Sequence, residues 1–228
     1  MRTKIYFLLC VISSLCIVTG CGEKKQDANP GVMVSHVRDK GDFSVVVLNG
    51  DAELVITPAD TTGIRIEADS MIINKVQTKI KDNVLTIDYK KEAHTKKTVK
   101  IFVSIIQIDR LECNGTVTLT TTEPIESDSL VCKISGAGKY TLLGSAEKEY
   151  IEISGAAEVH GFDLQTSSCR VKISGSGKVE TSVSDTLDVT IAGIGNVVYK
   201  GKPEVINKKI SGLGKVTEKI DGAEKQIK

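Results

Sequence analysis

The sequence predicts an all-β protein, a right-handed parallel β-helix (solenoid) with coils of about 19 residues and a β-rich cap at its N-terminal end. Two observations support this prediction: a strong bias toward β-branched residues and a short glycine motif that recurs along the chain. Valine, isoleucine and threonine make up 69 of the 228 residues. Their side chains are stiff at χ1 and pack well on a pleated surface. Helical bundles and coiled coils are excluded, because they are built mainly from alanine, leucine and glutamate.

Charge and aromatic content exclude further classes of protein. The chain has 30 Lys and Arg against 29 Asp and Glu, so it lacks the basic surface of a nucleic-acid binder. Tryptophan is absent and aromatic residues make up 4% of the chain, so stacking platforms for bases or sugars are scarce. No nucleic-acid partner is therefore expected.

The N-terminus has the features of a bacterial export signal. Arg2 and Lys4 precede an apolar run over residues 5–18, which is too short for an ordinary membrane span. The following Val18-Thr19-Gly20-Cys21 resembles a bacterial lipobox, which implies cleavage before Cys21 and lipidation of that residue. We therefore predict a signal peptide over residues 1–20, a polar tether over residues 21–38 and a membrane anchor at Cys21. This suggests an outer-membrane lipoprotein of the cell envelope, and the choice between the periplasmic and the outer face stays open.

A glycine motif recurs with spacings of 19, 20, 18 and 19 residues. Its copies are Ile134-Ser135-Gly136-Ala137-Gly138, Ile153-Ser154-Gly155-Ala156-Ala157, Ile173-Ser174-Gly175-Ser176-Gly177, Ile191-Ala192-Gly193-Ile194-Gly195 and Ile210-Ser211-Gly212-Leu213-Gly214. Apolar residues alternate before each turn, which indicates a strand with one buried face. A unit this short cannot bury that face alone, so neighbouring units must stack.

Two columns of residues provide an independent test of this stacking. If the coils stack in register, the residue between each pair of apolar positions and the residue after the second glycine form columns on the surface. The first column reads Glu112, Lys133, Glu152, Lys172, Thr190 and Lys209, and the second reads Lys139, Glu158, Lys178, Asn196 and Lys215. Both largely alternate in sign, as neighbouring strands prefer.

The solenoid is predicted over residues 109–217, preceded by a cap over 39–108 and followed by a polar tail over 218–228. The cap contains two hairpin signals, one at Asn49-Gly50-Asp51 and one at Lys81-Asp82-Asn83. A cap is needed because the first coil would otherwise leave an open sheet edge.

The lipobox, the β-rich lead-in and the Ser-Gly-x-Gly repeats together resemble the family named Putative auto-transporter adhesin, head GIN domain. The stretch most similar to it runs over residues 187–203, where Gly193-Ile194-Gly195-Asn196 precedes Tyr199-Lys200-Gly201-Lys202-Pro203. The resemblance covers residues 39–217 and implies a β-helix-like fold and a role in adhesion at the cell surface. Lys139, Lys178 and Lys215 stand where the family often has Asp or Asn.

Cofactor and metal chemistry finds little support in the motifs. The Gly-x-Gly turns lack the helix and the Gly-Lys-Ser/Thr sequence of a phosphate loop, and we expect glycines at positive φ in solenoid corners instead. Cys113, Cys132 and Cys169 are expected as buried free thiols. Cys113 and Cys132 lie on neighbouring coils two residues out of step, so their Cα atoms are about 8 Å apart and too far for a disulfide, and Cys169 lies one coil further on. We expect no cofactor and no metal ion.

An enzyme is the first alternative, because β-helices also carry polysaccharide lyases and hydrolases. Glu158 or Asp163 could face Glu180 on the next coil, as glycoside hydrolysis requires. However, Lys139 and Lys178 flank Glu158 and would keep it ionised. We therefore expect that the protein is not an enzyme.

The leading hypothesis is a non-catalytic, lipid-anchored adhesin or surface-interaction module, with an unidentified glycan or protein as its partner. Tyr140, Tyr150, His160 and Tyr199 are the candidate contact residues, on the expectation that they are exposed. A carbohydrate-active enzyme on the same scaffold and a structural periplasmic lipoprotein remain as alternatives.

Overall fold

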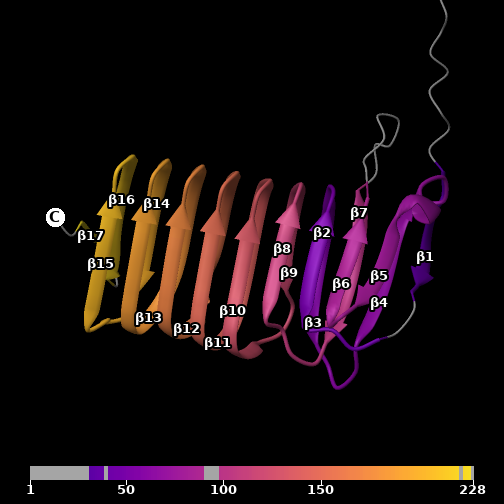
Figure 1. Cartoon of the computed structure of the whole chain (residues 1–228), viewed down its shortest axis with the longest axis horizontal. Coiled ribbons are helices and arrows are strands. Elements are labelled where there is room, and N and C mark those ends of the chain that lie inside the picture. Colours follow the sequence, from indigo (N-terminus) through magenta and orange to yellow (C-terminus); the bar gives the residue numbers. More distant parts are fainter. Residues whose placement is uncertain (1–30, 39–40, 90–97, 221–222, 227–228) are drawn as a thin grey trace, which may run out of the picture.

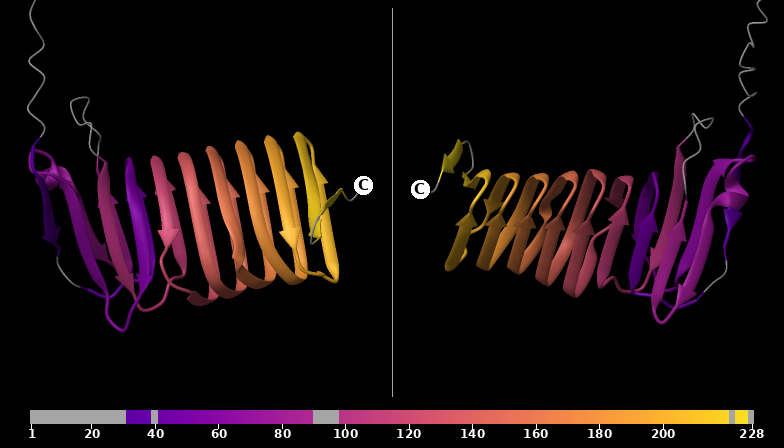
Figure 2. Two further views of the ribbon diagram at one scale, coloured as in Figure 1. Left: turned by 180° about the vertical axis from the view of Figure 1, so that it is seen from behind. Right: turned by 45° about the horizontal axis from the view of Figure 1, so that its top comes forward.

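The computed structural model describes residues 31–38, 41–89, 98–220 and 223–226. In these residues the chain forms a row of stacked β-coils with one short 3-10 helix, η1 (Ile73–Lys75). Figure 1 shows the strands side by side, from the N-terminal strands at one end to the C-terminal strands at the other. Both views in Figure 2 show the same continuous row, so the predicted all-β solenoid is confirmed.

The stack has two broad faces, because each coil crosses from one sheet to the other. The first sheet contains, in spatial order, β5 (Gln77–Lys81), β6 (Val84–Asp88), β2 (Val45–Asn49), β8 (Arg110–Asn114), β10 (Ile125–Ile134), the second halves of β11 (Ala137–Ile153), β12 (Ala156–Ile173) and β13 (Ser176–Ile191), and β15 (Val205–Ile210). The second sheet contains β1 (Met33–Val37), β4 (Gly63–Asp69), β7 (Val99–Ile105), β3 (Ala52–Pro58), β9 (Thr116–Thr121), the first halves of β11, β12 and β13, then β14 (Ile194–Lys200), β16 (Leu213–Ile220) and β17 (Ala223–Gln226).

The recurring glycine motif forms the turn between the two sheets in each repeat. The turns stack directly on one another, and the Ala156 amide donates to the Gly136 carbonyl at 2.9 Å. A Cβ atom on Gly155 would collide with that same carbonyl oxygen. The first glycine of the motif is therefore required by close approach between turns, and the expectation of positive φ holds only for some glycines, such as Gly138 at +151°.

The register of the strands confirms both predicted surface columns. Lys133 pairs with Glu112 on one side and Glu152 on the other, and Glu158 pairs with Lys139 and Lys178. Opposite charges thus face each other across adjacent parallel strands. In the first column the Nζ atom of Lys172 lies 2.7 Å from Oε1 of Glu152.

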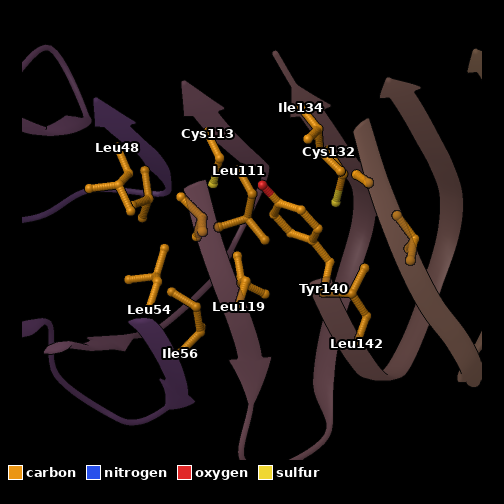
Figure 3. Packing of buried hydrophobic residues seen from close by; sticks show 14 of the residues in the cluster. Leu48, Leu54, Ile56, Leu111, Cys113, Leu119, Cys132, Ile134, Tyr140 and Leu142 are labelled. Carbon is orange, nitrogen blue, oxygen red and sulfur yellow. The ribbon is translucent and has the colours of Figure 1, made fainter. Parts of the chain in front are cut away.

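The predicted hairpin at Asn49-Gly50-Asp51 is wrong. Strands β2 and β3 do not pair with each other: β2 is parallel to β6 and β8, and β3 is parallel to β7 and β9. The turn instead crosses from one sheet to the other, as the Ser-Gly turns do. It does so because Leu48 and Leu54 both point into the shared interior from opposite sheets, where Leu48 is in register with Cys113 and Leu54 with Leu119 (Figure 3).

The second predicted hairpin is confirmed. Strands β5 and β6 are antiparallel, and Asp82 and Asn83 in the turn between them have φ of 51° and 64°. Both residue types tolerate the left-handed conformation better than other non-glycine residues.

Chain order and spatial order differ at the N-terminal end. The coil made by β2 and β3 lies between the coil of β6 and β7 and the coil of β8 and β9. The parallel stack therefore includes residues that we assigned to the cap. Beyond it, β1, β4 and β5 pair in antiparallel fashion and cover the N-terminal end.

At the C-terminal end of the stack, charged side chains occupy positions that are inward and buried in the preceding coil. In the last coil, Lys208 occupies the position in register with the buried Val189, and Glu218 the position in register with Tyr199. A charged side chain at an inward position opposes the addition of another apolar coil. Strand β17 covers the edge of β16 by antiparallel pairing.

The interior is one continuous apolar cluster along the described stack. Cys113, Cys132 and Cys169 are buried free thiols, which confirms the expectation for them. Burial raises the pKa of the Cys113 thiol to about 12, so this thiol is unreactive at neutral pH. Within the described ranges, no helix has the length and apolar character needed to cross a membrane.

Candidate functional site: a groove and a charged cluster on one outer face

The candidate site lies on the outside of the second sheet, where β11, β12, β13, β14 and β16 run side by side (Figure 1). Strand alternation decides which side chains reach it. In β12, Val159 points inward and is 1% exposed, whereas Glu158 and His160 point outward. Because the register is continuous, the same phase holds on the neighbouring strands.

A charged cluster bridges β12 and β13 on this face. His160 Nδ1 lies 2.9 Å from Glu180 Oε2, and its Nε2 lies 3.5 Å from Glu158 Oε2. Lys178 Nζ lies 2.9 Å from the other oxygen of Glu180. Two carboxylates, one imidazole and one ammonium group are therefore held together across a single coil boundary.

The electrostatics of Glu180 disfavour acid catalysis. Burial raises the pKa of Glu180, but hydrogen bonds and charge from Lys178 and His160 outweigh it, so that the net pKa is lowered. A general acid in glycoside hydrolysis needs the opposite shift. Glu158 lies between Lys139 and Lys178, as expected from the sequence.

A groove of about 730 Å³ crosses the same strands next to the glycine turns. Small residues at the ends of the inward columns line it, and on one side it is bordered by the column that contains Glu158, Lys178, Asn196 and Lys215. On the other side the outward residues are Ala156, Ser176 and Ile194, followed in register by Leu213. Ile194 and Leu213 are 60% and 75% exposed, which is high for large aliphatic residues.

The four predicted contact residues do not form one site. Tyr140 and Tyr199 are 3% and 1% exposed, so the expectation that they are exposed is wrong. Both occupy inward positions of the second sheet, and Figure 3 shows the Tyr140 hydroxyl pointing toward Leu111 and Cys113. Tyr150 and His160 are half-buried and point outward, but from opposite sheets. Contact by these two residues stays a prediction.

Cys21 and the predicted signal peptide lie outside the described residues. Among the residues that the structure does describe, no three His, Cys, Asp or Glu side chains gather closely enough to hold a metal ion.

Glu149 is a chemically unusual residue that sequence reasoning missed. Its side chain points into the core and is 3% exposed. Oε2 accepts hydrogen bonds from Cys169 Sγ at 3.3 Å and Thr181 Oγ1 at 3.2 Å, while Oε1 has no partner among the described residues. Burial raises the pKa of Glu149 to about 7. Its place in register between Leu130 and Cys169 was a signal available from the repeat.

The fold and this face define a parallel β-solenoid with an open surface groove. The chain belongs to the family described as Putative auto-transporter adhesin, head GIN domain, which it matches over residues 42–203. No curated protein matches the sequence.

The chain is similar to several solved structures, of which the first supports the fold. A putative adhesin from Bacteroides fragilis is 16% identical with a TM-score of 0.66, over 82% of this chain and 97% of that one. A putative adhesin from Parabacteroides distasonis is 20% identical with a TM-score of 0.49, over 83% and 98% of the two chains. A putative lipid binding protein from the same species is 18% identical with a TM-score of 0.46, over 83% and 98%. At these identities, the likeness to the Bacteroides fragilis protein concerns the fold alone.

Proposed function

We propose that this chain is a non-catalytic, lipid-anchored protein of the cell envelope that uses its solenoid as a rigid module for adhesion or surface interaction. The observation that carries this proposal is the outer face of the second sheet, where side chains are held in register beside an open groove. A surface that is already ordered loses little conformational entropy when it binds a partner. Membership of an adhesin family supports the same role.

The absence of catalysis is supported by the charges on this face. Lys178 contacts Glu180 and helps to lower the pKa of that carboxyl group, so Glu180 is placed to remain ionised, and Glu158 lies in register between Lys139 and Lys178. The alternative of a carbohydrate-active enzyme predicts new reducing ends or unsaturated sugars from a polysaccharide panel, and their loss in Glu180→Gln. We expect no such products from the wild-type protein.

The lipid anchor is supported by the lipobox-like Val18-Thr19-Gly20-Cys21. We expect the wild-type chain to fractionate with membranes and Cys21→Ser to be released from them. Several acyl chains on one residue hold a protein stably at a membrane, whereas their loss leaves no comparable anchor. A Cys21→Ser protein that stays in the membrane fraction after a high-salt wash would contradict the anchor.

Adhesion is tested by protease shaving of intact cells, with a known periplasmic lipoprotein as the control, followed by attachment assays. We expect digestion of this protein while the control survives, and reduced attachment of a deletion strain to glycan or matrix surfaces. Protection until the cells are lysed, or normal attachment with damaged envelope integrity, would favour the structural periplasmic lipoprotein instead.

A further inference from the structure

We infer that the groove on the second sheet binds a linear β-1,4-linked polysaccharide that lies along the solenoid axis, with about one sugar residue for each coil. This inference rests on the proposed function and names the class of ligand and the surface that takes it. The groove is lined by five successive strands, β11, β12, β13, β14 and β16. Neighbouring parallel strands are about 4.8 Å apart, so the groove extends for about 20 Å along the axis.

The lining of the groove is periodic. The strands that line the groove pair residue by residue, so their outward side chains recur once per coil. A ligand that uses all of these positions must itself repeat with a similar period. The sugar residues of an extended β-1,4-linked polysaccharide are about as long as the coil spacing. One residue can therefore lie over each coil, with successive residues presenting opposite edges to the same wall. A polypeptide of mixed sequence does not repeat its side chains in this way.

The pairing of these strands excludes strand addition by a peptide. Strand β13 is hydrogen-bonded to β12 on one side and to β14 on the other, and β14 is likewise paired with β16. The backbone donors and acceptors of β12, β13 and β14, which form most of the groove floor, are therefore already used in the sheet. Peptides that bind by adding a strand need a free sheet edge. Recognition in the groove must come from side chains.

The two walls of the groove differ in their chemistry. One wall carries Glu158, Lys178, Asn196 and Lys215, which offer hydrogen-bond donors and acceptors to ligand hydroxyl groups. Asn196 Oδ1 is shielded and has no partner among the described residues, so a small rotation of this side chain would offer an unsatisfied acceptor. The opposite side carries the exposed Ile194 and Leu213. A polar wall facing an aliphatic wall matches a pyranose ring, which has polar edges and apolar faces.

The charges of the groove favour neither a strongly anionic nor a strongly cationic polymer. Lys178 and Lys215 lie in the same wall as Glu158, and Glu180 and His160 adjoin it. The sign therefore changes along the wall. A neutral or weakly charged chain is the form that this arrangement accommodates without repulsion.

The test is calorimetric titration of the full chain, purified in mild detergent, with three probes: the β-1,4-linked hexamers of glucose, N-acetylglucosamine and mannuronic acid. We expect at least one neutral hexamer to bind, and to bind at least tenfold more tightly than its dimer, because the dimer reaches only part of the groove. Failure of both neutral hexamers to bind, whether or not the mannuronic acid hexamer binds, or equal affinity for dimer and hexamer, overturns the inference.

The substitution Ser176→Trp tests whether the ligand binds in the groove. Ser176 is an exposed outward residue, so the indole ring would fill the groove without entering the core. We expect at least a tenfold loss of affinity. Thr190→Trp is the matched control, because Thr190 is an exposed outward residue of the same strand, β13, in the part that lies on the opposite sheet. The affinity of this variant for the hexamer should equal that of the wild type. Lys215→Ala, at the exposed end of the groove, provides a second variant if Ser176→Trp lowers the melting temperature.

Failure of this inference can be separated from failure of the proposed function by cell attachment. Cells carrying Ser176→Trp that attach as well as the wild type, together with a protein that binds no hexamer, would leave the adhesin role intact and move the contact surface elsewhere. Binding of unstructured peptides in the groove, abolished by Ser176→Trp, would also overturn the polysaccharide assignment.

Discussion

The N-terminal coils and the repeat coils reach the same structure by different sequences. One inward column runs through both, from Leu54 and Leu119 to Tyr140, Val159 and Val179. Yet residues 45–58 and 84–105 carry no copy of the Ile-Ser-Gly motif. Strands in which every second residue is apolar and points inward are therefore enough to build a coil in this fold.

The difference between the two regions lies in the turns. At the N-terminal end, Asn114 Nδ2 donates to Asn49 Oδ1 at 2.9 Å, and Asn49 Nδ2 donates to Asp88 Oδ1 at 2.7 Å. Side-chain hydrogen bonds thus connect successive turns. Direct backbone contact between turns occurs in both regions: a Cβ on Gly50 would collide with the Tyr89 carbonyl oxygen, as a Cβ on Gly155 would with that of Gly136. The turn glycine therefore occurs in both regions, and the difference lies in the residue before it, which is Asn at Gly50 and Gly115 and is Ser or Ala in the repeat.

The largest expected effect comes from adding one carbon atom to a repeat turn. Gly155→Ala would place its Cβ against the Gly136 carbonyl oxygen, so the stack must separate locally. We expect a loss of unfolding free energy of more than about 3 kcal/mol, in the range of severe single substitutions. Urea denaturation checks this.

Gly63→Ala in β4 is the matched control from the N-terminal region. The nearest atom to its new Cβ is Ser104 Cβ at 3.7 Å, which is ordinary contact. A change within about 1 kcal/mol is expected there. Equal destabilisation by both substitutions would show that close approach between turns is not the cause of the effect at Gly155.

The second effect concerns the interiors, because the repeat buries the carboxyl group of Glu149, whereas the buried side chains of residues 45–58 are all apolar. The pKa of Glu149 is raised to about 7, above its ordinary value of 4.5. The folded state therefore binds more protons than the unfolded state between these values, and the stability present below pH 4.5 is lost as the pH rises through 7. This group alone should lower the unfolding free energy by about 3 kcal/mol across that window.

Glu149→Gln separates this contribution from all other titrating groups. The amide keeps the size of the side chain but does not ionise, so the variant should lose that part of the pH dependence and gain stability relative to wild type above pH 7. Chemical denaturation of both proteins at pH 5 and pH 8 gives the comparison. Parallel pH profiles for the two proteins would refute a buried, titrating Glu149.

The smallest effect is expected from a surface ion pair that extends the second charged column into the N-terminal coils. Lys100 Nζ lies 3.1 Å from Glu53 Oε2, and both side chains are substantially exposed. A double-mutant cycle with Lys100→Ala and Glu53→Ala should give a coupling energy below about 1 kcal/mol that falls with added salt. A larger coupling that is insensitive to salt would show that the columns contribute more to the stack than we infer.

The fold was predictable because two signals agreed. The spacing of the glycine motif set the coil length, and the alternating charges of residues such as Glu152 and Lys172 fixed the register. The turn at Gly50 was misjudged because an Asn-Gly-Asp sequence describes only a local reversal. Whether the next strand returns to its neighbour or crosses the core depends on distant partners such as β8 and β9.

The candidate site was less predictable. Tyr140 was expected at the surface although it directly follows the outward Lys139, and that phase makes it inward. Glu149 was missed for the corresponding reason, because an acidic residue at an inward position was not sought. The groove was missed because its shape depends on how small residues from five strands line up, and no single stretch of sequence contains that information.

The position of the β2–β3 coil between two later coils has a kinetic consequence. This coil can bury both of its sides only after the chain has continued as far as β9, so its neighbours on both sides are supplied by later residues. Pairing over such sequence separations is slow, because a long loop must close before contacts compensate for it. We therefore expect folding to begin with a rate-limiting nucleus spanning β2 to β9. The repeat coils would then add one after another in the direction of the C-terminus, each on a template that is already complete.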